Sequence, residues 1–116
     1  MYQMAYAEIA EDSLATSRSR EREAFDRSIT LLQAAARKDH FSHEAVEAIQ
    51  FTNQLWSALI TDLSSPENQL SEQLRANLIS IGMWILDETD RIRRRLSLNF
   101  QGIIDITSTI RAGLAH

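Results

Sequence analysis

The amino-acid sequence predicts an all-α protein: a small antiparallel bundle of about four long helices, preceded by a short N-terminal helical segment. Apolar residues recur at steps of three and four along four separate stretches, which is the period of a helix with one buried face. The 116 residues include only three Gly and one Pro, so few positions interrupt a helix. Because the stretches are joined by short connections, we expect antiparallel neighbours in one domain, residues 1–116.

The composition excludes several kinds of site. There is no Cys, which rules out disulfides, thiolate catalysis and cysteine-bound zinc or iron. The net charge of −4 gives no general attraction to nucleic acid or anionic lipid. The longest apolar run is broken by Ser80 and Gly82 and is too short to span a membrane. Residues 1–10 lack the basic and long apolar parts of a secretory signal, so we expect a cytoplasmic protein with no membrane partner.

The N-terminal part of the chain predicts a short segment and then the first long helix. Residues 1–16 are a candidate mobile segment whose spacing fits one short amphipathic helix. The positions that fit are Tyr2, Tyr6 and Ile9. Ser17 or Ser19 can cap the long helix that follows. Its apolar positions are Phe25, Ile29, Leu32 and Ala36, and Arg37 and Lys38 are the cations expected near its C-terminus.

The second helix follows a short connection at residues 39–41. Ser42 can cap it, and Ser64 and Pro66 end it. Asn53 is the polar exception on its apolar face and has two interpretations. It is either an amide satisfied locally or at the solvent edge, or a polar residue that fixes the register between helices. The face consists of Val46, Ile49, Asn53, Trp56, Ile60 and Leu63.

The third helix, expected over residues 71–96 with Ser71 as its cap, is apolar on nearly every side in its middle. Such a helix must be buried all round, unless one side is left open for a partner. Gly82 costs on the order of 1 kcal/mol inside a helix, so we expect close approach there by a helix of this chain or of a partner. Trp56 and Trp84 are core residues or anchors of a binding groove. The main apolar face consists of Leu74, Leu78, Ile81, Ile85 and Ile92, interrupted by Glu88.

The last helix and the charges before it complete the pattern. Gly113 is placed to end the last helix as a glycine cap. Before this helix, three acidic residues stand three or four positions ahead of arginines and can form pairs within the third helix. The acids are Asp87, Glu88 and Asp90, and the arginines are Arg91, Arg94 and Arg95. The apolar positions of the last helix are Phe100, Ile103, Thr107, Ile110 and Leu114.

No group of residues in the sequence has the pattern of a catalytic or metal site. His40, His43, Glu44 and Glu47 are of metal-ligating types, but a closed zinc site needs four ligands in tetrahedral geometry. We interpret the cluster as a solvated helix start. The sequence has no phosphate-binding Gly-rich loop, zinc-protease motif or nucleophile elbow. We therefore expect no enzyme activity, no catalytic residue, no metal and no cofactor.

Residues 74–84, with the sequence LRANLISIGMW, resemble the signature of the FlaF family of flagellar biosynthesis regulators. Further parts resemble the family in the same order: residues 19–23, the Leu55 and Trp56 pair ahead of Asp62, and residues 104–106 with 112–114. One position departs from the pattern, because Ser71 stands where relatives often carry Pro. Either residue starts a helix.

The resemblance implies a small helical cytoplasmic protein that binds flagellin before export, as a secretion chaperone does. It would support flagellin synthesis and filament assembly and would work alongside FlbT, the factor that restrains flagellin translation. Unassembled flagellin has amphipathic terminal segments, and a bundle with an exposed apolar groove can cover one as a helix in a groove. The resemblance implies no enzymatic activity.

Six residues are expected to form the partner-binding groove, although the same side chains would serve equally as core. They are Ile81, Met83 and Trp84 of the third helix and Ile103, Ile106 and Ile110 of the last. Residues 1–16 would cover this groove until flagellin binds. The alternative function is post-transcriptional regulation of flagellin expression, with FlbT or on flagellin mRNA through residues 91–95. Because acids lie beside these arginines, direct nucleic-acid binding is not expected.

Overall fold

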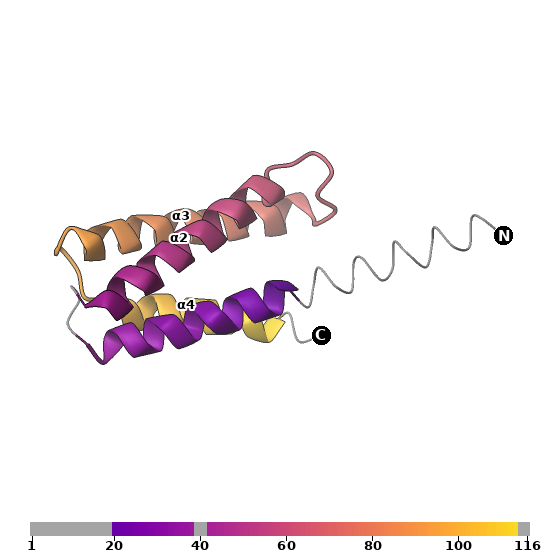
Figure 1. Ribbon diagram of the computed structural model, residues 1–116. Coiled ribbons are helices and arrows are strands. Elements are labelled where there is room, and N and C mark those ends of the chain that lie inside the picture. Colours follow the sequence, from indigo (N-terminus) through magenta and orange to yellow (C-terminus); the bar gives the residue numbers. More distant parts are fainter. Residues whose placement is uncertain (1–19, 39–41, 114–116) are drawn as a thin grey trace.

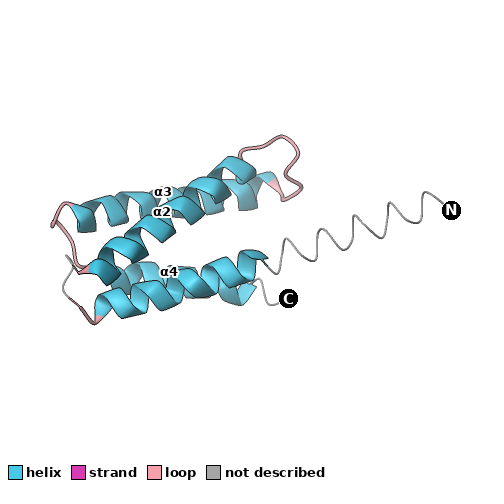
Figure 2. Cartoon of the chain, in the orientation of Figure 1, coloured by secondary structure: helices cyan, strands magenta, loops and turns pink. Residues whose placement is uncertain are grey.

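The computed structural model describes residues 20–38 and 42–113, and over these ranges the chain forms four helices and no strand. The first helix covers residues 20–36, and α2 (His43–Leu63), α3 (Glu72–Arg93) and α4 (Phe100–Gly113) follow. Consecutive helices run in opposite directions, with the loops at the two ends of the bundle (Figures 1 and 2). The predicted antiparallel all-α bundle is confirmed.

Several sequence-based expectations fall outside the described residues. These are the helical segment at residues 1–16 with Tyr2, Tyr6 and Ile9, the caps Ser17 and Ser19, the connection at residues 39–41, and Leu114. Within the described ranges, no helix is long and apolar enough to cross a bilayer.

Side-chain caps start the last three helices. The Ala45 N–H donates a hydrogen bond of 3.1 Å to Ser42 Oγ, and the Leu74 N–H donates one of 3.2 Å to Ser71 Oγ. Both predicted caps are confirmed, and each contributes about 1 kcal/mol. Asn99 does the same for α4, because its Oδ1 accepts from the Gly102 N–H at 3.0 Å.

α3 ends in a left-handed C-terminal cap, the type of helix end that the sequence predicted at Gly113 of α4. The Leu96 N–H donates to the Arg91 carbonyl at 2.8 Å, and the Arg95 N–H donates to the Ile92 carbonyl at 3.1 Å. This pair of bonds defines a Schellman motif, whose left-handed position is usually Gly. Here it is Arg95, with φ of 67°. Gly113 is the last residue of α4, and no described glycine has positive φ. The predicted glycine cap at Gly113 is therefore wrong.

The hydrophobic core is built from all four helices around Trp56, which is only 1% exposed. Its ring meets that of Phe25 edge to face, with centroids 6.0 Å apart, an arrangement that adds about 1 kcal/mol to the area buried. The core consists of Phe25, Leu32, Ala35, Ala45, Ala48, Ile49, Trp56, Ile85, Ile92, Phe100, Ile103 and Ile104.

Small residues take two of the core positions that the sequence assigned to their neighbours. Val46 is 56% exposed, whereas Ala45 and Ala48 are fully buried. In the first helix Ala36 is exposed and Ala35 is buried. In α2 the buried stripe follows Ala45 and Ala48 rather than the larger Val46, because small side chains allow helix axes to approach closely. In the first helix both candidates are alanine, and the buried one lies one position earlier than predicted.

The third helix is not buried all round: the described helices leave one side of it uncovered, which is the second of the two alternatives that the sequence left open. Its buried positions are Gly82, Ile85, Glu88, Thr89 and Ile92, which lie along one side. Met83 is 62% exposed, and Trp84 and Leu74 are nearly half exposed. Because α3 lies at the outside of the bundle (Figure 1), part of its apolar surface remains uncovered by the described helices.

α3 approaches α2 closely at Gly82. A Cβ atom built on Gly82 would lie 2.7 Å from Trp56 Cε3 and 3.0 Å from Ile60 Cδ1. Carbon atoms pack at about 3.5 to 4.0 Å, so any side chain here would push the helices apart. The expectation of close approach is confirmed, and the approaching helix belongs to the same chain.

Polar pairs connect the helices in the middle of the core. The Thr89 hydroxyl donates to Asn53 Oδ1 across α2 and α3 at 2.5 Å. At the neighbouring position of α2, the buried hydroxyls of Thr52 and Ser28 lie 3.1 Å apart and share a hydrogen bond. Since a shift along the helix axis would break both pairs, the structure supports the interpretation that Asn53 fixes helix register.

Candidate functional site

Two of the six predicted partner-binding residues line one surface hollow between α3 and α4. Trp84 of α3 and Ile106 of α4 face it, together with Gly102, Asp105 and Thr109. The hollow is open to solvent and has a volume of about 360 Å³. Trp84 is 43% exposed, so its indole offers a large apolar contact area without any change in the fold.

The polar groups of this hollow are held by local hydrogen bonds. Gln101 Nε2 donates to Asp105 Oδ1 at 2.7 Å, and the Thr109 hydroxyl donates to the Asp105 carbonyl at 3.0 Å. Gly102 donates its N–H to Asn99 Oδ1, and a Cβ atom built on Gly102 would lie 2.4 Å from Asn99 Nδ2. The site therefore presents an indole and an aliphatic side chain next to one carboxylate.

The other four predicted residues lie elsewhere. Ile103 is fully buried in the core, and Ile81 is half buried and packs against it. Ile110 lines a separate cavity at the end of the bundle. Met83 is exposed, but it is one residue from Trp84 and therefore about 100° further round the helix. A role in partner binding stays a prediction for all six.

Sequence reasoning missed Gly102, Asp105 and Thr109. The signal that would have found them is their spacing, since residues 102, 105, 106 and 109 repeat at three and four and share one face of α4. Only Ile106 of this set is apolar. A search for apolar periodicity therefore selected the buried face of α4 and overlooked the neighbouring stripe.

The arginines at the end of α3 are partly neutralised. Arg93 donates a hydrogen bond to Asp90, and Arg94 Nε lies 3.0 Å from Asp90 Oδ2. The hydrogen bond from Arg93 lowers the pKa of the Asp90 carboxyl below its ordinary value, and the charge of Arg94 adds to this effect. Glu88 is buried and accepts a hydrogen bond from the Ser97 hydroxyl. Its carboxylate therefore connects α3 to the loop between α3 and α4.

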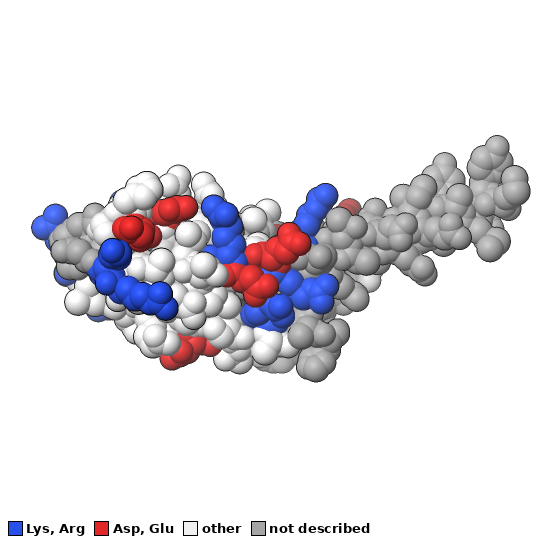
Figure 3. Space-filling model, turned by 60° about the horizontal axis from the view of Figure 1, so that its bottom comes forward, with Lys and Arg blue, Asp and Glu red and all other residues white. Residues whose placement is uncertain are grey.

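Charges of both signs are also mixed elsewhere on the surface. On the face shown in Figure 3, basic and acidic side chains lie next to one another. Between α4 and the first helix, Arg111 Nε lies 2.7 Å from Asp26 Oδ1. Such mixing gives no extended positive potential on this face for a phosphate backbone to follow.

The histidine and glutamate cluster at the start of α2 is open to solvent. His43 Nε2 lies 3.8 Å from Glu47 Oε2, and the His43 side chain is 88% exposed. His40 lies outside the described residues. In the ranges 20–38 and 42–113, no group of three or more metal-ligating side chains comes together.

Comparison with known proteins identifies a family. The model of the family described as flagellar protein FlaF matches residues 2–114. No curated protein and no solved structure matches the chain. Residues 74–84, the stretch that resembles the family signature, fall on α3 and include Gly82 beside α2 and Trp84 at the surface hollow. Because the match covers nearly the whole chain, this protein belongs to the FlaF family of flagellar proteins.

Proposed function

We propose that this protein binds flagellin in the cytoplasm as a secretion chaperone, and so supports flagellin synthesis and filament assembly. Membership of a flagellar family supports the biological setting. The observation that carries the binding role is the half-exposed Trp84 beside Ile106 in the hollow between α3 and α4.

The hollow suits one apolar side of an amphipathic helix. Tryptophan is among the residues that most often dominate the free energy of a protein interface, because its ring gives much contact area for little loss of side-chain entropy. A flagellin terminal segment that is disordered before assembly would fold as it docks. Its ordering would cost several kcal/mol, which keeps the complex reversible at the export stage.

The test is calorimetric titration of the full chain with intact flagellin and with flagellin truncated at either terminus. We expect a one-to-one complex with intact flagellin that is lost when one particular terminus is removed. The lost terminus then identifies the recognised segment. Binding of FlbT or flagellin mRNA, with no binding of intact flagellin, would overturn the chaperone role and favour post-transcriptional regulation.

A further inference from the structure

Helix α4 places one uncompensated negative charge at the hollow between α3 and α4, the Trp84 hollow. The helix carries two charged side chains, Asp105 and Arg111, and Arg111 pairs with Asp26 of the first helix. Asp105 is exposed and lines the hollow. Its Oδ1 accepts a hydrogen bond from the neutral amide of Gln101. No Lys or Arg of the described residues forms an ion pair with it.

The polar side chains of α4 that line this hollow are hydrogen-bond acceptors. An ionised carboxylate such as that of Asp105 has no proton to donate. The Thr109 hydroxyl uses its proton in a hydrogen bond to the Asp105 carbonyl at 3.0 Å, so its oxygen is left to accept. The N–H of Gly102, which also lines the hollow, is taken by Asn99. These groups favour a ligand that donates, and a cationic donor also offsets the charge of Asp105.

The apolar part of the lining favours a cation carried on an apolar stem. Trp84 is 43% exposed, Ile106 is half-buried, and no Lys or Arg lines the hollow. Lys and Arg bury their methylene groups on apolar surface while the charged head stays outside. Among aromatic rings, the indole attracts a cation most strongly. Lys and Arg are therefore the side chains that match both the apolar wall and the carboxylate.

We propose that the Trp84 hollow selects a basic side chain, a Lys or Arg at the edge of the apolar face of the helix that docks there. The stem of this side chain lies against Ile106 and the indole ring, and Asp105 holds its charged head. Asp105 thereby determines which amphipathic helices bind. This inference rests on the proposed binding of flagellin, because it names the residue type by which flagellin is recognised.

The test is calorimetric titration of the full chain and its Asp105→Asn variant with flagellin at about 50 mM salt. The substitution removes the charge and keeps an Oδ1 acceptor for Gln101, at an exposed position where the fold does not depend on it. We expect flagellin to bind Asp105→Asn about threefold to fivefold more weakly, the upper range for an exposed ion pair. At about 200 mM salt the difference should fall below about twofold, because salt screens exposed charges.

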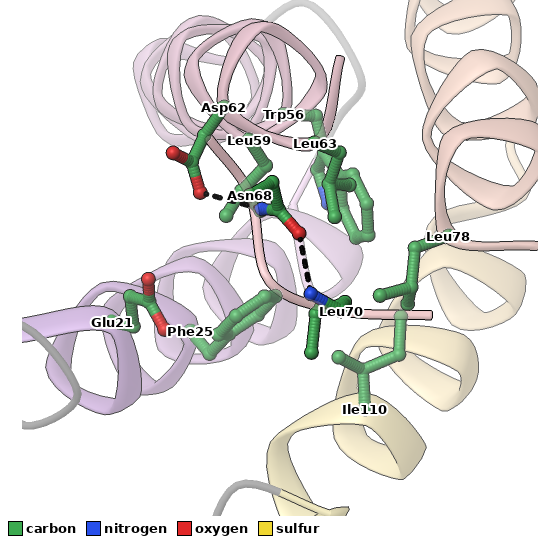
Figure 4. Close-up of a pocket in the computed structure, with 10 residues that line it drawn as sticks. All are labelled: Glu21, Phe25, Trp56, Leu59, Asp62, Leu63, Asn68, Leu70, Leu78 and Ile110. Atoms are coloured by element: carbon green, nitrogen blue, oxygen red, sulfur yellow. Dashed lines mark hydrogen bonds between the residues drawn. The ribbon is translucent and has the colours of Figure 1, made fainter. Parts of the chain in front are cut away.

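Asp62 supplies a matched control. It is also an exposed carboxylate that accepts from a neutral amide, since Asn68 Nδ2 donates to Asp62 Oδ2 at 3.3 Å (Figure 4). Asp62 lines a cavity at the end of the bundle, and none of the residues lining that cavity lines the Trp84 hollow. Asp62→Asn removes the same charge from the molecule and should change the affinity for flagellin by less than about twofold.

A double-mutant cycle identifies the basic residue of flagellin. Each Lys and Arg of the flagellin terminus that this protein recognises is replaced in turn by Gln. One replacement should weaken binding to the wild-type chain about threefold to fivefold and leave binding to Asp105→Asn unchanged. Reversing both charges, with Asp105→Lys and with Glu in place of that base, should restore the affinity that Asp105→Lys loses.

Two results would overturn this inference and leave the proposed function standing. One is flagellin that binds and loses affinity in Trp84→Ala, but binds Asp105→Asn and Asp62→Asn equally. The other is a set of flagellin variants in which no Lys or Arg couples to Asp105. A wild-type chain that binds no flagellin at either salt concentration would instead overturn the proposed function, and this inference with it.

Discussion

Trp84 and Met83 are adjacent in sequence but differ in what surrounds them. Trp84 lines the hollow with Ile106, whereas Met83 is 62% exposed and does not line it. If flagellin docks in the hollow, Trp84→Ala should weaken its binding at least about thirtyfold, the effect of losing a central interface aromatic. Met83→Ala is the matched control, with a change of less than about threefold. Calorimetric titration measures both; equal losses would place the contact elsewhere.

Arg95 carries a backbone conformation that suits glycine, with φ of 67°. An L residue pays about 1 kcal/mol to occupy this region, so Arg95→Gly should raise the free energy of unfolding by about 0.5 to 1 kcal/mol. Arg95→Ala is the control, because it removes the same side chain and keeps the strained backbone. Urea unfolding of the three proteins measures the difference. An alanine variant as stable as the glycine variant would attribute the effect to the side chain instead.

At the scale of elements, the contact between α2 and α3 depends on Gly82. Alanine is the better helix former by about 1 kcal/mol, yet its Cβ would lie 2.7 Å from Trp56 Cε3. We expect the clash to dominate, so that Gly82→Ala lowers the free energy of unfolding by about 1 to 3 kcal/mol. Ser80→Ala, at an exposed position of the same helix, should change it by less than about 0.5 kcal/mol.

Thermal or urea unfolding of the Gly82→Ala and Ser80→Ala proteins measures both changes in the free energy of unfolding. A stabilised Gly82→Ala protein would mean that α2 and α3 separate at little cost, and that helix propensity outweighs packing at this crossing. In that event Trp56, the residue nearest to the added carbon, would be the side chain that moved.

The helices and their starts could be predicted from sequence because their causes are local. Ser42 and Ser71 cap the residues three positions further on, and the spacing of Phe100, Ile103 and Thr107 is visible without a partner helix. Gly82 was informative for a similar reason, since an interior glycine implies a close neighbour. These features need only a few consecutive residues.

The candidate site could be predicted only in part, because it depends on how helices face one another. Trp84 and Ile106 meet across two helices, and nothing local distinguishes Ile106 from the buried Ile103. Val46 is exposed for a similar reason, because Ala45 and Ala48 of the same helix form the face that packs against the other helices. Arg95 shows another limit, because it adopts a positive φ at a position where sequence rules expect glycine.

At the scale of the whole molecule, net charge and surface decide how partner binding should respond to salt. The protein has a net charge of −4, Arg93 and Arg94 are paired with Asp90, and the candidate hollow offers an indole and an isoleucine. Apolar burial is not screened by salt, whereas each phosphate neutralised by a cation makes affinity fall steeply as salt rises.

We therefore expect the affinity for flagellin to change by less than about threefold between 50 and 200 mM salt, whereas a protein gripping several phosphates loses about a thousandfold or more. Calorimetry at these two salt concentrations measures the change, with Asp90→Asn as a second protein. Removing this carboxylate frees Arg93 and Arg94 and should strengthen any binding to flagellin mRNA, while binding to flagellin stays the same. A steep salt dependence for flagellin itself would move its contact from the Trp84 hollow to the charged end of α3.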